Sequence, residues 1–233
     1  MNIAEKRIMR DVKTVVATNK DILESQGIYY IPNDETMKKG IALLVGQSGT
    51  PYFGGFYFFF IEFPDDYPFS PIKVRSLTQD GKTRFNPNMY IQGKVCLSIL
   101  NTWHDGPQWS GIQSLESILL VLMSEVLCSN PLANEPAYRN CGTSVESVVY
   151  NRLLWHANVQ TAIIGMLTQL PNEFQEFSTI LQKEFTKHST EIKTKLTEYL
   201  PYDSKTESIR VFSFGCTYEF QSLLEKIEAL IKN

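Results

Sequence analysis

Residues 84–109 read RFNPNMYIQGKVCLSILNTWHDGPQW and hold one cysteine, Cys96, eight positions after Asn88. Turn-forming residues precede the cysteine, and the apolar run around it, 95–100, is too short for an ordinary helix. We therefore expect Cys96 on an irregular segment packed against a sheet. A cysteine held at a surface by a rigid loop is a candidate nucleophile, although most free cysteines are small buried hydrophobes.

Motifs on both sides of the cysteine resemble those of ubiquitin-conjugating enzymes. In that family a Phe-His-Pro-Asn element precedes the thioester-forming cysteine at this spacing, and here Phe85–Asn88 precedes Cys96 with Asn86 in place of the histidine. Upstream, 63–71 (FPDDYPFSP) is similar to the family's Phe-Pro-x-x-Tyr-Pro-x-x-Pro loop. Downstream, Asn130-Pro131 and Asn134-Glu135-Pro136 follow in the family's order.

The resemblance implies a fold and an activity. The fold would be α+β, with a four-stranded antiparallel meander sheet, an N-terminal helix and a central crossing helix. Residues 1–160 would form the conjugating core, and 161–233 a mostly helical C-terminal extension packed on that core. The chain would accept ubiquitin or a ubiquitin-like modifier from an activating enzyme as a thioester on Cys96, and transfer it to a substrate lysine, usually with a ligase.

That chemistry sets requirements that can be stated without the family. An ordinary cysteine, with a pKa of about 8.5, is only slightly ionised at neutral pH, and a lysine with a pKa of about 10.4 is almost wholly protonated. The site must help the lysine and stabilise the oxyanion that forms on the thioester carbonyl. Asn88 matches the family's asparagine near the thioester, where it would brace the loop or contact the oxyanion. Glu135 matches an acidic residue that would position the lysine.

Two surfaces are expected to bind partners. Lys6, Arg7 and Arg10 resemble the basic residues with which the family's first helix docks on the activating enzyme, although most charged faces are merely solvated. Phe69 lies on the proline-stiffened loop of the family's ligase-docking face. Ser110 and Ile112 form the other half, where many relatives have Ser-Pro-Ala, and this departure leaves the choice of ligase open.

Hydrophobic periodicity predicts the elements independently. Asn2 with Glu5, and Ser110 with Gln113, have the pattern of capping boxes that begin helices. The central run 56–61 is too uniformly apolar for a solvated face and indicates a central strand covered on one side. The short runs predict strands at 28–31, 41–45, 57–63, 72–74 and 209–214, with helices around 112–126, 145–153, 174–185 and 220–231.

Composition excludes several classes of function. A net charge of −3 is unfavourable for nucleic acid as the main partner. The four cysteines are scattered, without the spacing of a disulfide framework or a zinc site, so we expect free thiols, no metal and no cofactor. The longest apolar run is too short to span a membrane, and the first residues lack the apolar core of a signal peptide. We expect a cytoplasmic protein, with the nucleus as a second compartment.

Two alternatives stay open. One is a cysteine hydrolase in which His104, His156 or His188 activates Cys96, although no cysteine-protease signature surrounds the cysteine. The other is a catalytically inactive relative that binds a modifier without forming a thioester. That class typically lacks the cysteine, which this chain retains.

Overall fold

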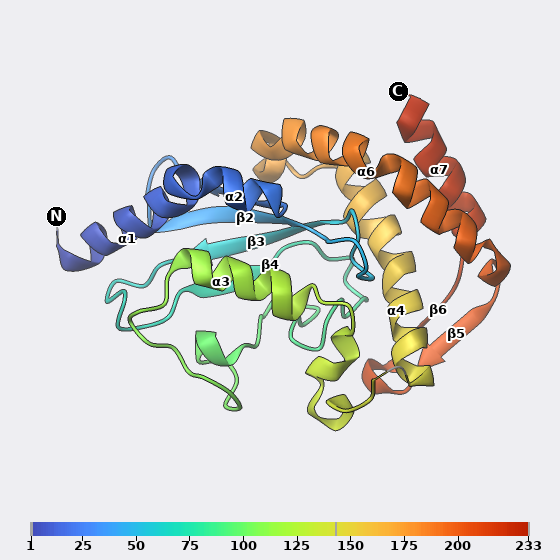
Figure 1. Cartoon of the computed structure of the whole chain (residues 1–233), viewed down its shortest axis with the longest axis horizontal. Helices are drawn as coiled ribbons and strands as arrows, with labels where there is room; N and C mark the ends of the chain where they lie inside the picture. Colours follow the sequence, from blue (N-terminus) through green and yellow to red (C-terminus); the bar gives the residue numbers. More distant parts are fainter. Residues whose placement is uncertain (1, 143, 233) are drawn as a thin grey trace.

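The computed structural model describes residues 2–142 and 144–232 and is built around a four-stranded antiparallel sheet (Figure 1). The strands pair in the order β1-β2-β3-β4, which confirms the predicted meander. They are β1 (Ile28–Pro32), β2 (Lys39–Val45), β3 (Phe56–Glu62) and β4 (Lys73–Ser76). The register is continuous across the sheet, with Ala42 opposite Tyr30 on one side and Phe59 on the other.

The N-terminal helix α1 (Ile3–Lys13) begins where the sequence predicts. The Asn2 side chain accepts a hydrogen bond from the Glu5 amide, and the Glu5 carboxylate accepts one from the Asn2 amide. The helix continues through a π-helical turn, η1 (Thr14–Thr18), into α2 (Lys20–Ser25). Apolar residues recur at helical spacing along this segment, at Ile8, Val12, Val15 and Val16; the first three are buried and Val16 is half-buried against the core.

The crossing helix α3 (Leu115–Val121), continued by η3 (Leu122–Val126), begins later than predicted. Its cap is Ser114, whose hydroxyl accepts a hydrogen bond from the amide of Ser117. Ser110 and Gln113, the predicted capping pair, instead close a turn before the helix through a 3.0 Å bond between their main chains. The capping prediction was wrong because a turn and a helix start have the same local sequence requirement.

The central strand β3 is covered on both faces, so the prediction of one covered face was wrong. Phe58 stacks on Phe174 with ring centroids 4.0 Å apart and meets Phe177 edge-on. Phe174 and Phe177 belong to the short helix η7 (Asn172–Phe177). The next helix, α6 (Ser178–Tyr199), adds a 2.9 Å hydrogen bond between the Tyr29 hydroxyl and the buried Glu184 carboxylate.

Helix α4 (Val145–Ala157) runs without a break into η6 (Asn158–Gly165) and α5 (Met166–Thr168), across the expected boundary at 160. The apolar positions predicted for this helix are Val145, Val148, Val149 and Leu153, and the structure confirms them in part. Leu153 is buried and Val149 packs half-buried against the core, but Val145 and Val148 are exposed. The other core residues of the helix are Tyr150 and Leu154. The two exposed valines lie in the first turn of the helix, and their spacing is that of an apolar stripe although this turn projects into solvent.

After α6 and the short η8 (Leu200–Tyr202), the chain forms a hairpin and a last helix, α7 (Phe220–Lys232). The predicted strand over 209–214 is wrong, because β5 (Thr206–Ile209) and β6 (Phe214–Thr217) pair with each other around the turn η9 (Val211–Ser213). The last helix buries Phe220, Leu223, Leu224 and Ile227, which confirms most of its predicted apolar face, but Ile231 near its end is exposed.

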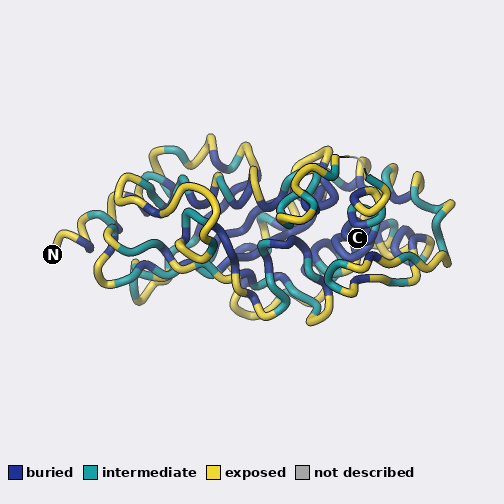
Figure 2. The backbone as a smooth tube through the Cα atoms, turned by 90° about the horizontal axis from the view of Figure 1, so that it is seen from below, coloured by how far each residue is buried: buried dark blue, intermediate teal, exposed yellow. Residues whose placement is uncertain are grey.

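Buried polar contacts join the C-terminal elements to the sheet. The Asn158 side chain accepts a 2.7 Å hydrogen bond from the Tyr57 hydroxyl and donates to the Phe53 carbonyl. Arg152 binds Glu207 at 2.5 Å, which ties β5 to α4. Figure 2 accordingly shows buried residues running from the sheet into the C-terminal helices. Within the described residues, no helix has the length and apolar character needed to cross a membrane.

We predict that the covering of Phe58 contributes substantially to stability. Replacing Phe174 with alanine removes a stacked, 1% exposed ring and should cost roughly 3–5 kcal/mol, seen as a fall in the thermal midpoint. Phe69→Ala is the matched control, because that ring is 83% exposed and its loss should change the midpoint little. Equal midpoints for the two variants would show that residues 172–177 are not part of the stabilising core.

Candidate active site

Cys96 lies on an irregular segment, as predicted, between the bridge residue Val95 and the short helix η2 (Ser98–Leu100). It is more buried than a surface nucleophile was expected to be, with 4% of the residue exposed. It nevertheless lines an open groove of about 470 Å³. The other lining residues are Tyr90, Lys94, Asn101, Thr102, Trp103, His104 and Gln108.

Asn86 is fully buried and holds the loop before the cysteine. Its Nδ2 donates to the Val126 carbonyl at 2.7 Å and to the Tyr52 hydroxyl at 3.3 Å. Its Oδ1 accepts from the Asn88 amide at 2.7 Å and from Asn134 Nδ2 at 3.3 Å. These four contacts use both ends of the amide, so the asparagine connects the end of η3, the turn before β3 and the loops of Asn88 and Asn134.

Asn88 contacts Cys96 through both its main chain and its side chain. Its carbonyl accepts a 2.8 Å hydrogen bond from the Cys96 amide, and its Nδ2 donates to the Cys96 carbonyl at 2.5 Å. Asn88 therefore braces the active-site loop, which is one of the two roles predicted for it; the other is contact with the oxyanion. A primary amide carries a second N–H, so bracing does not consume the whole donor capacity of this side chain.

Thr102 holds the main chain on both sides of the cysteine, a role that no motif or spacing predicted. Its hydroxyl accepts a 2.9 Å hydrogen bond from the Leu97 amide and lies 3.0 Å from the Val95 carbonyl. Asn101, in the left-handed conformation (φ 54°), accepts a 2.9 Å bond from the Trp109 amide. Sequence spacing alone could not reveal these contacts because they depend on how the loop after Cys96 folds back.

Glu135, half-buried, caps the turn η5 (Pro136–Tyr138). The preceding residue Asn134 joins this segment to the active-site loop through Asn86, and also donates to the Glu125 carbonyl at 2.7 Å. Beyond the turn, an ion pair of 2.5 Å between Arg139 and Asp105 connects it to the loop after Cys96, and the guanidinium lowers the pKa of the aspartate. The loops of Glu135 and Cys96 are thus connected twice.

The other cysteines and histidines do not form a second nucleophilic centre. Burial raises the pKa of the Cys128 thiol, and raises that of Cys216 to about 11, so both are protonated at neutral pH. His156 Nδ1 lies 3.7 Å from the Cys216 sulfur, and burial lowers the pKa of this histidine. Among residues 2–142 and 144–232, no hydrogen bond joins a histidine to Cys96, and no cluster of ligands is placed to hold a metal.

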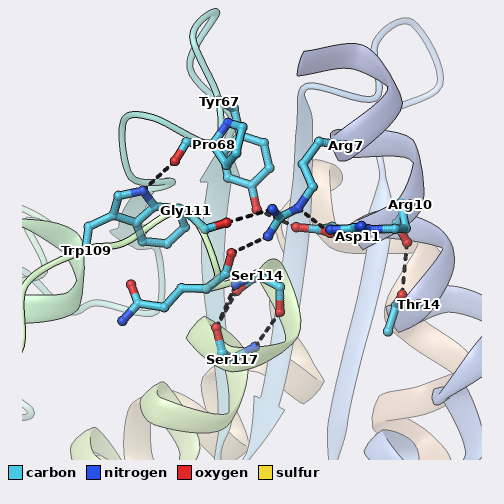
Figure 3. Close-up of polar contacts among 11 residues, drawn as sticks. Arg7, Arg10, Asp11, Thr14, Tyr67, Pro68, Trp109, Gly111, Ser114 and Ser117 are labelled. Atoms are coloured by element: carbon cyan, nitrogen blue, oxygen red, sulfur yellow. Dashed lines mark hydrogen bonds and ion pairs between the residues drawn. The ribbon is translucent and has the colours of Figure 1, made fainter. Parts of the chain in front are cut away.

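The three basic residues of α1 that were predicted to dock have different environments, and Figure 3 shows two of them, Arg7 and Arg10. Lys6 and Arg10 are exposed. Arg7 is largely enclosed and donates to Asp11 at 2.9 Å, to the Gly111 carbonyl at 2.7 Å and to the Gln113 carbonyl at 2.5 Å. Its guanidinium therefore connects α1 to the loop before α3, which is a structural role. Binding of the activating enzyme through Arg7 stays a prediction.

The predicted ligase-facing residues come from two loops that the structure brings together. The Trp109 indole donates to the Pro68 carbonyl at 2.8 Å (Figure 3), which joins the loop of Phe69 to that of Ser110 and Ile112. Phe69 and Ile112 are 83% and 91% exposed, and Ser110 is exposed as well. Two apolar side chains standing in solvent on a braced surface are typical of a partner contact.

Comparison with known proteins agrees with this geometry. Residues 7–153 match the family model of ubiquitin-conjugating enzymes. Ubiquitin-conjugating enzyme E2 Z of Xenopus tropicalis is 38% identical over 183 residues (77% of this chain, 55% of the relative), and that of Danio rerio 32% over 225 (96% and 66%). The human dual E2 ubiquitin-conjugating enzyme/E3 ubiquitin-protein ligase BIRC6 is 33% identical over 204 residues, covering 84% of this chain and 4% of its own length.

The chain thus spans about half to two thirds of the length of these E2 Z relatives. The similarity to enzyme Z was expected from the active-site sequence, in which Asn86 replaces the histidine and Gly93–Leu100 reads GKVCLSIL, and it is confirmed. With the matching family model, the meander sheet and its crossing helix, the chain belongs to the ubiquitin-conjugating enzyme family.

Proposed function

We propose that this chain carries ubiquitin, or a ubiquitin-like modifier, as a thioester on Cys96 and transfers it to a lysine of a protein substrate. The observation that supports this most strongly is the arrangement of Cys96, which lines an open groove while Asn88 binds the main chain on both sides of its α-carbon. This arrangement also disfavours an inactive binding module, which would have no use for a thiol so placed.

The first half-reaction is thioester exchange. The Cys96 thiolate attacks the modifier's terminal carbonyl, which arrives as a thioester on the activating enzyme, and the activating enzyme's cysteine leaves as a thiolate. One thioester is broken and one is formed, so the net free-energy change is small. The groove beside Cys96 would receive the extended end of the modifier, between the walls formed by Tyr90 and Trp103.

The second half-reaction moves the modifier to nitrogen. The neutral amine of the substrate lysine attacks the thioester carbonyl, an oxyanion develops on the carbonyl oxygen, and the Cys96 thiolate departs as the amide forms. The amine loses its proton to solvent or to a nearby base. The second N–H of Asn88 would stabilise the oxyanion, and Glu135 would hold the incoming lysine close to the thioester.

Partner docking would use the two surfaces described above. Lys6 and Arg10, two exposed cations of α1, would meet an acidic surface of the activating enzyme. Phe69, Ser110 and Ile112 would meet the ligase, with the two apolar side chains as anchors. Arg7 joins the two surfaces mechanically, because it belongs to α1 and binds the carbonyl of Gly111 between Ser110 and Ile112.

The Cys96→Ser variant tests the carrier role. Incubated with activating enzyme, ATP and ubiquitin, the wild-type chain should form an adduct that a reductant removes. The serine variant should form a reductant-resistant oxyester or no adduct, because oxygen replaces the attacking sulfur. Cys216→Ser is the matched control and should load normally, since burial keeps that thiol protonated. A reductant-sensitive adduct in Cys96→Ser would move the nucleophile to another cysteine.

A second prediction concerns Asn88 and Glu135 in the discharge of purified thioester to free lysine. Asn88→Ala should slow discharge on the order of 10²–10³-fold if it removes an oxyanion donor. Thr102→Val is the control, because it loosens the same main chain without removing an amide donor. Equal slowing in both variants would make Asn88 only a brace. Glu135→Ala should slow discharge less, and its defect should shrink from pH 7 to 10 as the free amine deprotonates.

A third prediction concerns the exposed cations. Reversing Lys6 and Arg10 to glutamate should reduce the loading rate by about tenfold or more, and the wild-type rate should fall with added salt, as electrostatically steered association does. Reversal of Lys226 and Lys232 on α7 makes the same change in net charge at the opposite end of the molecule (Figure 1). If both pairs slow loading equally, net charge and not a docking site is responsible.

A further inference from the structure

The hairpin between β5 and β6 turns through a backbone conformation that is unfavourable for its residues. Phe212 and Ser213, in η9, have φ values of 63° and 49°, in the left-handed region that residues with a Cβ rarely adopt. Such conformations persist where the surrounding structure holds them, and they are found at functional sites more often than elsewhere. The hairpin itself is fixed, because Glu207 of β5 binds both Arg152 and the Tyr218 hydroxyl.

The turn places Phe212 against Arg84, two positions before Asn86. The Arg84 guanidinium carbon lies 4.4 Å from the centre of the Phe212 ring and 3.9 Å from that of Tyr90. The guanidinium is therefore enclosed between two aromatic rings, a geometry that favours arginine over lysine. Tyr90 is also a wall of the Cys96 groove, so the stack reaches from the C-terminal hairpin to the active site.

Arg84 holds the active-site loop directly. Its Nη2 donates to the Pro87 carbonyl at 2.6 Å, immediately before Asn88, and its own carbonyl accepts a 2.7 Å bond from the Tyr150 hydroxyl. Its Nε is buried without a hydrogen-bond partner among the described residues. Hydrogen bonds thus fix only part of the guanidinium, and the two rings supply the rest of its positioning.

We infer that Phe212 is a positioning residue for the transfer reaction, although it lies about 116 residues after Cys96 in the sequence. Phe212 packs on the Arg84 guanidinium, which binds the Pro87 carbonyl and so positions the adjacent Asn88. The same guanidinium packs on Tyr90 and keeps that ring at the groove. The inference rests on the proposed function, and it gives the C-terminal hairpin a role in the chemistry of Cys96. The residue acts through its aromatic face and touches neither the thioester nor the lysine.

The role predicts a defect in rate and not in lysine affinity. Because the loop sets the geometry of the transition state, the maximal discharge rate of Phe212→Leu should fall by about tenfold. The lysine concentration that gives half the maximal rate should stay nearly constant. For comparison, misplacing a reacting group by about 1 Å can lower a reaction rate on the order of 10²-fold. Leucine keeps an apolar side chain of similar bulk in this half-buried site without an aromatic face. Phe212→Tyr keeps the aromatic face and should discharge at close to the wild-type rate.

The experiment is single-turnover discharge of purified ubiquitin thioester to free lysine by full-length variants, with thermal midpoints measured in parallel. Val211→Ala, in the same turn, is the control and should discharge normally. Arg84→Lys keeps the charge but not the planar stack, and combining it with Phe212→Leu should add little to the larger single defect. Unchanged discharge in Phe212→Leu, or additive defects in the double variant, would overturn the positioning role. Failure of the wild-type chain to load would instead contradict the proposed function itself.

Discussion

The active-site loop depends on one buried amide. Asn86 has no contact with solvent, and its two ends bind four groups on separate parts of the chain. A buried amide left without these partners would be strongly destabilising, so the loop has little freedom to adopt another conformation. The same amide sets the Asn88 main chain, and Asn88 in turn binds both main-chain groups of Cys96. The position of the thiol therefore follows from the packing of the loop and not from any contact with the sulfur.

The C-terminal elements extend this arrangement and change the sheet on which it rests. Phe174 and Phe177 cover Phe58, so β3 has no solvated face, and Asn158 binds the strand from the other end through Tyr57. Helix α4 then continues without interruption into η6 and α5, so the C-terminal elements are rigidly joined to the part of the chain that holds the sheet (Figures 1 and 2). A loop that must keep its shape through two half-reactions gains from such a rigid support.

Sequence reasoning predicted the parts of the molecule whose signals are local. The spacing from Asn88 to Cys96, the capping of α1 by Asn2 and the four-strand meander are all present as expected. It failed where one local pattern serves two structures. Ser110 closes a turn and not a helix, Val145 has helical spacing on an exposed turn, and alternation over 209–214 hides the reversal at Phe212. Contacts such as Thr102 to the main chain on either side of Cys96, and Phe212 to Arg84, depend on tertiary folding, so no spacing rule could have supplied them.

The central claim is that the preformed loop makes Cys96 the one acyl acceptor of the chain. Intact-mass measurement of the wild-type protein after a single exposure to activating enzyme, ATP and ubiquitin, followed by peptide mapping without reductant, tests it most directly. The account predicts the addition of one ubiquitin, located on the peptide that contains Cys96 and released by hydroxylamine. An adduct on Cys128, Cys141 or Cys216, or an unmodified chain under conditions that charge another conjugating enzyme, would contradict it.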